Sequence, residues 1–360
     1  MNFSARIKKT QNLIEEKGYK ALLIEEPLNI LYLTGLDISM GQLLIDTSSA
    51  SILVDSRYYE ECKKLGTIDV VATTKTALVE ALTKKSIKSV TVDGATMTYN
   101  SFIALEKKLS SKDITLVAAD SPLKELRSIK DAEEIKSLRN SAALAAQGWD
   151  YACSILKEGI TEKAVATEME IFWKKNGGEA PSFESNISFG ANSALPHHRA
   201  GTSKLTKNSV ILMDIGVTVE NYASDMTRVA FFGDPSTEIT KIHDIVQRAQ
   251  KAALELCRPG TDLGTLDNAA RNIISAEGYG EYFSHGLGHG VGLNVHETPV
   301  VTHKDPWCDI KLQEGMVITV EPGIYLPDIG GVRIEDTIVI TKDGYESLTQ
   351  RPTEAIVIEV

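Results

Sequence analysis

Acidic residues interrupt two apolar, strand-like segments in the second half of the chain. Asp214 lies in Met-Asp-Ile-Gly and Asp225 in Ser-Asp-Met-Thr, although aspartate is disfavoured inside strands. If residues 210–217 and 222–232 pair as a hairpin that turns near residues 219–220, the two aspartates lie opposite one another. Opposed like charges destabilise a sheet unless a cation lies between them. The pattern therefore indicates a cation site, and two unrelated turn carboxylates are the alternative.

A second pair of carboxylates follows the same logic. Glu321 lies in Val-Glu-Pro-Gly and Glu335 in Arg-Ile-Glu-Asp, within strand-like residues 317–325 and 331–341. The segment Pro-Asp-Ile-Gly-Gly at residues 327–331 is a strong turn signal. A hairpin here places both glutamates on one face. The two hairpins together predict an oxygen-rich site for a pair of divalent ions.

Histidines form the third element of this pattern. Three of the chain's seven histidines, His285, His289 and His296, lie close together in the sequence. The glycines that alternate through residues 286–292 disfavour a helix, so this is not the paired-histidine helix of a zincin. Val300 rules out a His-Glu-x-x-His motif, and the glycine spacing does not match a dinucleotide-binding loop. The cluster indicates chemistry rather than a structural role.

The charges of these groups suit metal ions. Four carboxylates carry four negative charges, which two divalent cations balance. Oxygen ligands with one imidazole suit Mn²⁺, Co²⁺, Zn²⁺ or Fe²⁺, and we expect two ions, with Mn²⁺ as the first choice. Two such ions ~3.5–4 Å apart can hold a bridging hydroxide as nucleophile and polarise the carbonyl that it attacks. The pattern therefore predicts hydrolysis of an amide or an ester.

The length of 360 residues indicates about two domains. Helical and strand patterns alternate until a break at Asp-Ser-Pro, residues 120–122. We predict an α/β domain at residues 1–125 and an α+β domain at residues 131–360. In the first domain, strands are expected near residues 21–24, 42–45, 52–55, 69–72, 89–92 and 114–118. Helices are expected near residues 5–18, 56–65, 76–85, 101–110, 131–156, 161–175, 236–256 and 265–277.

Composition excludes some classes of partner. The net charge of −11 argues against the basic face that nucleic acids bind. No window approaches ~18 consecutive apolar residues, so no transmembrane helix is expected. The N-terminal Met-Asn-Phe-Ser-Ala-Arg has no apolar run behind its basic residue and is unlike a signal peptide. We therefore expect a cytoplasmic protein that binds neither nucleic acid nor a membrane.

Five of these residues follow the order of a metallopeptidase signature: an Asp, a second Asp eleven residues later, a His and two Glu. This order and the flanks MDIG, SDMTR, GHGVGLNVHE, VEPGIY and RIED resemble the family of Xaa-Pro aminopeptidases, Xaa-Pro dipeptidases (prolidases) and methionine aminopeptidases. The resemblance covers roughly residues 130–350 and implies the pita-bread fold, in which two related halves enclose the metals. The matching residues are Asp214, Asp225, His289, Glu321 and Glu335.

The first third of the chain resembles the smaller, creatinase-like amino-terminal domain of the same family. Residues 29–35 (NILYLTG), residues 54–58 (VDSRY) and the junction at residues 126–135 (LRSIKDAEEI) carry this resemblance. Methionine aminopeptidases generally lack that domain, so the proline-directed branch is favoured. Members of the family often form dimers, and we expect a homodimer.

The resemblance also implies roles for the five matching residues. Asp214 is expected to chelate one ion, while Asp225 and Glu335 bridge both ions. His289 and Glu321 are expected to complete the other ion. Glu321 is also the expected proton acceptor.

Four further residues match groups that surround the metals in this family. His197, His285 and His296 match histidines that stabilise the tetrahedral intermediate and shuttle protons. Arg333 matches an arginine that anchors active-site carboxylates or substrate.

Many prolidases carry an arginine after His-Glu-x-Pro, where this chain has Val300. Because a bidentate carboxylate clamp is missing, the sequence favours an Xaa-Pro aminopeptidase acting on peptides with proline at the second position. The alternatives are an Xaa-Pro dipeptidase and a non-catalytic pita-bread protein that binds peptides or partners.

Overall fold

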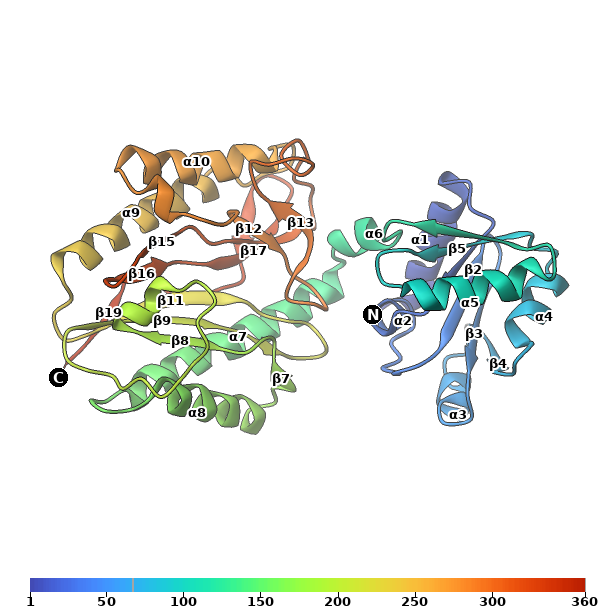
Figure 1. Ribbon diagram of the computed structural model, residues 1–360, viewed down its shortest axis with the longest axis horizontal. Coiled ribbons are helices and arrows are strands. Elements are labelled where there is room, and N and C mark those ends of the chain that lie inside the picture. Colours follow the sequence, from blue (N-terminus) through green and yellow to red (C-terminus); the bar gives the residue numbers. More distant parts are fainter. Residues whose placement is uncertain (67, 360) are drawn as a thin grey trace. The chain divides into compact units, whose positions relative to one another are not determined.

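The computed structural model describes residues 1–66 and 68–359. The chain divides into two compact units, Met1–Leu126 and Arg127–Val360 (Figure 1). Each unit contains its own hydrophobic core. None of the helices within the described residues combines the length and the apolar character that a membrane crossing requires.

A six-stranded mixed sheet forms the N-terminal unit. Its order is β4-β3-β2-β1-β5-β6, in which β1 pairs antiparallel with β2 and parallel with β5. The strands are β1 (Ala21–Ile24), β2 (Gln42–Asp46), β3 (Ala50–Val54), β4 (Asp69–Ala72), β5 (Ser89–Asp93) and β6 (Thr115–Ala119). The helices are α1 (Phe3–Glu16), α2 (Pro27–Thr34), α3 (Tyr59–Lys63), α4 (Ala77–Lys84) and α5 (Tyr99–Ser110). Helix α6 (Lys124–Ser128) begins in this unit and ends two residues beyond it.

Helix α2 is an element that the sequence analysis does not predict. Pro27 stands in its first turn, and the Glu26 carboxylate accepts a hydrogen bond of 2.7 Å from the Asn29 N–H. Gly35, at φ 76°, ends the helix in the left-handed conformation. These are ordinary start and stop signals, but they enclose only eight residues, which are too few for a readable helical period.

The second unit contains two main sheets between two pairs of helices, as Figure 1 shows. One sheet has the order β19-β11-β9-β8 and packs against α7 and α8. The side chains of Trp149 and Trp173 fill the space between these helices and the strands. The elements of this half are α7 (Ala132–Ile155), α8 (Glu162–Lys175), β7 (Ala180–Pro181), β8 (Asn186–Phe189), β9 (Ser209–Ile215), β10 (Val217–Thr218), β11 (Met226–Phe232) and β19 (Ile356–Ile358).

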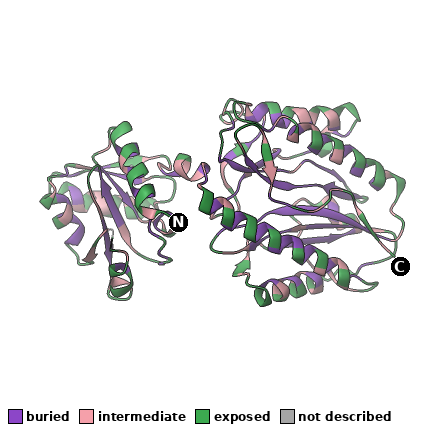
Figure 2. Cartoon of the chain, turned by 180° about the vertical axis from the view of Figure 1, so that it is seen from behind, coloured by how far each residue is buried: buried purple, intermediate pink, exposed green. Residues whose placement is uncertain are grey.

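The other sheet has the order β13-β12-β14-β17-β18 and packs against α9 and α10. Its strands β14 and β17 are buried throughout, whereas the outer faces of the helices are exposed (Figure 2). The elements are α9 (Thr237–Leu254), α10 (Leu263–Ala276), β12 (Gly288–Gly290), β13 (Glu297–Val301), β14 (Val317–Val320), β15 (Gly323–Leu326), β16 (Gly330–Arg333), β17 (Asp336–Ile340) and β18 (Tyr345–Ser347). Two short 3₁₀ helices, Gly190–Ala194 and Gly280–Tyr282, precede the loops that carry site histidines.

The first predicted hairpin forms, but its predicted register is wrong. Strands β9 and β11 pair antiparallel with Asp214 opposite Thr227, not opposite Asp225. The turn residues are Glu220 and Asn221, at φ 52° and 67°, one position later than expected. Asparagine tolerates the left-handed conformation that this tight turn requires, and a shift of the turn by one residue moves each partner by two. Because side chains alternate with a period of two, both aspartates still belong to one face of the pair.

The second predicted hairpin is confirmed. Strands β14 and β17 pair with Val320 opposite Asp336, and β15 and β16 continue the same register with Gly323 opposite Arg333. Glu321 and Glu335 lie at the break between these two ladders, where both strands leave regular pairing. The hairpin therefore brings the two glutamates to one place in the fold.

Candidate metal centre

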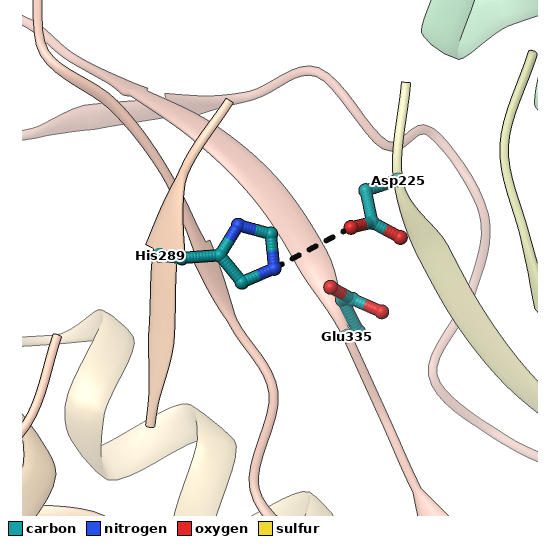
Figure 3. Close-up of side chains that lie close together, drawn as sticks. All are labelled: Asp225, His289 and Glu335. Atoms are coloured by element: carbon teal, nitrogen blue, oxygen red, sulfur yellow. Dashed lines mark ion pairs between the residues drawn. The ribbon is translucent and has the colours of Figure 1, made fainter. Parts of the chain in front are cut away.

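Three of the predicted ligands converge from separate elements. A ring nitrogen of His289 and one carboxylate oxygen each of Asp225 and Glu335 all lie within 4.8 Å of one another. Figure 3 shows the three side chains pointing toward a common space. His289 Nε2 lies 3.5 Å from Asp225 Oδ2 and 3.4 Å from Glu321 Oε1. Glu321 therefore joins the group through its contact with the imidazole.

Asp214 reaches the site through an arginine. The Arg333 guanidinium forms an ion pair with Asp214 Oδ2, and its Nε lies 3.9 Å from Glu321 Oε2. The same guanidinium donates to the Tyr325 hydroxyl at 2.9 Å and to the Thr227 hydroxyl at 3.1 Å. Arg333 thus fixes the position of one carboxylate while it partly balances the negative charge of the group.

The electrostatics of the carboxylates fit a cation site. Burial raises the pKa of Asp225 well above its usual range, and repulsion from Glu335 and Asp214 raises it further. Burial likewise raises the pKa of Glu335, with repulsion from Glu321 and Asp214 added. Burial also raises the pKa of Glu321. Buried carboxylates that repel one another in this way are stabilised by divalent cations, so the donor set fits the predicted metals.

The imidazole of His289 presents the nitrogen that a metal requires. Its Nδ1 lies 3.0 Å from the Gly290 carbonyl oxygen, which can only accept, so the proton is on Nδ1. Nε2 is then free of a proton and faces the carboxylates. Burial lowers the pKa of His289, which favours the neutral form that binds metals.

His285 has partners for both ring nitrogens. Nδ1 donates to the Gly286 carbonyl at 2.7 Å, so Nε2 accepts the hydrogen of the Tyr325 hydroxyl at 2.8 Å. Burial raises the pKa of Tyr325 to about 12, so this hydroxyl keeps its proton at neutral pH. His285, Tyr325, Arg333 and Asp214 therefore form one continuous chain of hydrogen bonds.

His296 and His197 lie at the more open side of the group. The His296 and His289 rings are 4.3 Å apart and meet edge to face. Burial and repulsion from His289 lower the pKa of His296, and His197 adds a smaller repulsion. His197 is exposed, whereas the neighbouring His198 is tied to buried Glu162 at 2.9 Å. The structure thus places His197 on an anchored loop with its side chain accessible.

Three site residues escaped the sequence analysis. Thr319 donates to Glu321 Oε1 at 3.1 Å and accepts the His289 N–H at 3.0 Å. Thr227 donates to Glu335 Oε2 at 2.7 Å and accepts from Arg333. Tyr325 is the third. A signal existed for both threonines, because each lies two residues from a predicted ligand and strand side chains share a face at that spacing.

The fold and this group of carboxylates and histidines define a metal-dependent peptidase, and comparison with known proteins supports that class. Residues 136–342 match the model of metallopeptidase family M24, and residues 6–129 match the creatinase/prolidase N-terminal domain. The chain belongs to metallopeptidase family M24. The predicted family and the predicted two-domain fold, with its pita-bread catalytic part, are confirmed.

Similar proteins align along almost the whole chain. A Pyrococcus horikoshii protein named Xaa-Pro dipeptidase is 39% identical over 353 residues, which is 98% of each chain. The solved structure of an Xaa-Pro dipeptidase from Bacillus anthracis has a TM-score of 0.95 at 31% identity and covers 99% of this chain and 100% of that chain. The solved structure of an X-Pro aminopeptidase from Thermotoga maritima has a TM-score of 0.89 at 31% identity and covers 96% of this chain and 100% of that chain.

Proposed function

We propose that this peptidase is an Xaa-Pro dipeptidase, which hydrolyses the amide bond between the first residue and proline in a two-residue peptide. The observation that carries the proposal is the similarity to the P. horikoshii dipeptidase over 98% of both chains. This similarity favours the dipeptidase over the aminopeptidase to which Val300 had pointed. A missing arginine removes one clamp for the free carboxylate of a dipeptide, but the N–H groups of His197 and His296 are other donors for it.

We assign the metal ions to the five residues of the predicted signature. Asp225 and Glu335 are the proposed bridging ligands, because a carboxylate oxygen of each lies within 4.8 Å of the other and of a ring nitrogen of His289. Asp214 completes one ion and Glu321 the other, and this ligand set suits Mn²⁺. Two such cations would polarise the scissile carbonyl and lower the pKa of the attacking water.

Glu321 is the proposed proton acceptor. Its Oε1 is oriented by the Thr319 hydroxyl at 3.1 Å, and Arg333 lies on the side of its Oε2. Burial, which raises the pKa of Glu321, favours a carboxyl that takes a proton from water and returns it to the departing proline nitrogen. His197 and His296 are the proposed donors to substrate, because His285 is engaged with Gly286 and Tyr325.

A comparison of two substrates tests the proposal. The Mn²⁺-loaded protein is expected to cleave an Xaa-Pro dipeptide and to leave the tripeptide Xaa-Pro-Yaa largely intact. Exclusive cleavage of the tripeptide would show an aminopeptidase instead. Asp225→Ala is expected to abolish cleavage, and Asp234→Ala, which removes an exposed aspartate, is the matched control. Metal binding without cleavage of either peptide would point to the peptide-binding alternative.

A further inference from the structure

An ion pair between Asp267 and Arg271 on α10 contacts the histidine-rich loop at residues 283–287. Asp267 is fully buried, and its Oδ1 accepts from Arg271 Nε at 2.7 Å. Arg271 Nη2 donates to the second oxygen at 3.1 Å, so the pair is bidentate. His303 Nδ1 adds a contact of 3.0 Å to Oδ1. None of these groups has a role in the proposed reaction.

The two side chains hold three main-chain groups of the loop from Phe283 to Leu287. Arg271 donates to the Phe283 carbonyl at 3.0 Å and to the His285 carbonyl at 2.7 Å. Asp267 Oδ2 accepts the Leu287 N–H at 3.1 Å. The Arg271 guanidinium also lies 4.2 Å from the centre of the Phe283 ring. One ion pair therefore satisfies carbonyl and N–H groups on both sides of His285.

This loop is connected to two of the proposed metal ligands. The Leu287 carbonyl accepts the Glu321 N–H at 2.8 Å, so one residue links Asp267 to the main chain of Glu321. The His285 ring begins the chain of hydrogen bonds through Tyr325 and Arg333 that ends at Asp214. A displacement of the loop would thus move ligands in both halves of the unit.

We propose that Asp267 and Arg271 are positioning residues, which hold the loop around His285 so that Glu321 and Asp214 keep the spacing that binds metal. The inference rests on the proposed metal site and is independent of the choice between dipeptide and longer substrates. Ligand orientation by groups that do not touch the metal typically changes metal affinity by about 10–100-fold.

The test uses Arg271→Lys in the full chain. Lysine keeps the charge beside Asp267 but cannot span a carboxylate and two carbonyls at once, because it lacks the planar fork. The matched control is Arg248→Lys on α9, where Arg248 pairs with Asp244 at 2.9 Å with the same i,i+4 spacing but on the exposed surface. Asp267→Asn, which keeps the shape and removes the charge, is the second variant.

Two measurements that do not depend on peptide cleavage test the proposal. Titration of metal-free protein with Mn²⁺ is expected to show binding about 10–100-fold weaker in Arg271→Lys and unchanged in Arg248→Lys. Amide hydrogen exchange across residues 283–287 is expected to be faster in Arg271→Lys alone. Tyr325→Phe already removes the hydrogen bonds that connect His285 through Tyr325 and Arg333 to Asp214. In that variant, Arg271→Lys is therefore expected to weaken Mn²⁺ binding less than it does in the wild-type protein.

Several outcomes would overturn the proposal. A folded Arg271→Lys protein that binds Mn²⁺ like the wild type, or whose loop exchanges at the wild-type rate, would do so. Failure of both Arg271→Lys and Asp267→Asn to fold would mean that the pair stabilises the whole unit rather than this loop. A wild-type protein that binds Mn²⁺ but cleaves no Xaa-Pro peptide would contradict the proposed function and leave this inference standing.

Discussion

Thr227 and Glu335 are joined by two hydrogen bonds. The Glu335 N–H donates to the Thr227 carbonyl at 3.1 Å, and the Thr227 hydroxyl donates to Glu335 Oε2 at 2.7 Å. Thr227 belongs to β11 in one sheet, and Glu335 directly precedes β17 in the other. The two halves of the catalytic unit are therefore connected at the proposed metal site itself.

Replacement of this hydroxyl should weaken metal binding. Thr227→Val keeps the shape but leaves Glu335 Oε2 and Arg333 Nε without this partner, so we expect Mn²⁺ affinity to fall by about tenfold. Loss of a partner for buried polar groups should also lower the free energy of unfolding by about 1–3 kcal/mol. Calorimetric titration and denaturant unfolding measure the two effects. Thr227→Ser should restore both, and equal losses in Val and Ser variants would contradict the role of the hydroxyl.

Removal of the metals should make stability fall as the pH rises. The pKa values of Asp225, Glu321 and Glu335 are raised in the folded protein. Above the unfolded values of about 4, the folded chain therefore binds protons that the unfolded chain has released, and each proton lost destabilises the fold. Urea unfolding of protein whose metals have been removed with a chelator, measured between about pH 5 and pH 8, gives this change of stability with pH.

Two comparisons check the origin of that slope. Metal-loaded protein should show little of it, because the cations favour the charged carboxylates. Asp225→Asn should flatten it in the metal-free protein, since one buried repulsive charge is removed. If the metal-free protein gained stability as the pH rose across the same range, the carboxylates would not repel one another as described.

The Tyr325 hydroxyl should matter although it is not a proposed metal ligand. Tyr325→Phe removes the hydrogen bonds of the hydroxyl to His285 and Arg333. Arg333, which forms the ion pair with Asp214, then loses one of the partners that hold it in place. We expect kcat to fall about tenfold with KM changed less, as for other losses of ligand orientation. Steady-state kinetics on an Xaa-Pro dipeptide give both values. Tyr345→Phe, which alters a 39% exposed tyrosine on β18, should be neutral, and a neutral Tyr325→Phe would exclude the chain of hydrogen bonds from catalysis.

Val300 offers a test of substrate choice. It pairs with His289 across β12 and β13 and is 37% exposed. Val300→Arg should add a bidentate donor for a free carboxylate and lower KM for dipeptides by about tenfold, with a smaller effect for tripeptides. Val300→Lys, which lacks the fork, should give less of this effect. If arginine lowered KM equally for both substrates, position 300 would not face the carboxylate.

Local patterns in the sequence determined most of the elements. The helix over Ala132–Ile155 was readable because its Asp131 cap and its Ala- and Leu-rich period are local features. The hairpin that carries Glu321 and Glu335 was readable from a turn signal between two apolar runs. Helix α2 was missed because eight residues carry too little periodicity against surrounding apolar sequence.

Only the tertiary structure decided how these elements meet. The register that places Asp214 opposite Thr227 depends on the position of the turn at Glu220 and Asn221, and a shift of one position in that turn changes every partner. The chain of hydrogen bonds from His285 through Tyr325 to Arg333 joins the histidine-rich loop to the hairpin of β15 and β16, and no spacing rule relates these two segments. The sequence alone determined which residue types are available for a metal site and, through the order of its signature, the family. The convergence of Asp225, His289 and Glu335 arises from the packing of two sheets, because burial of apolar faces brings distant segments together independently of their separation along the chain.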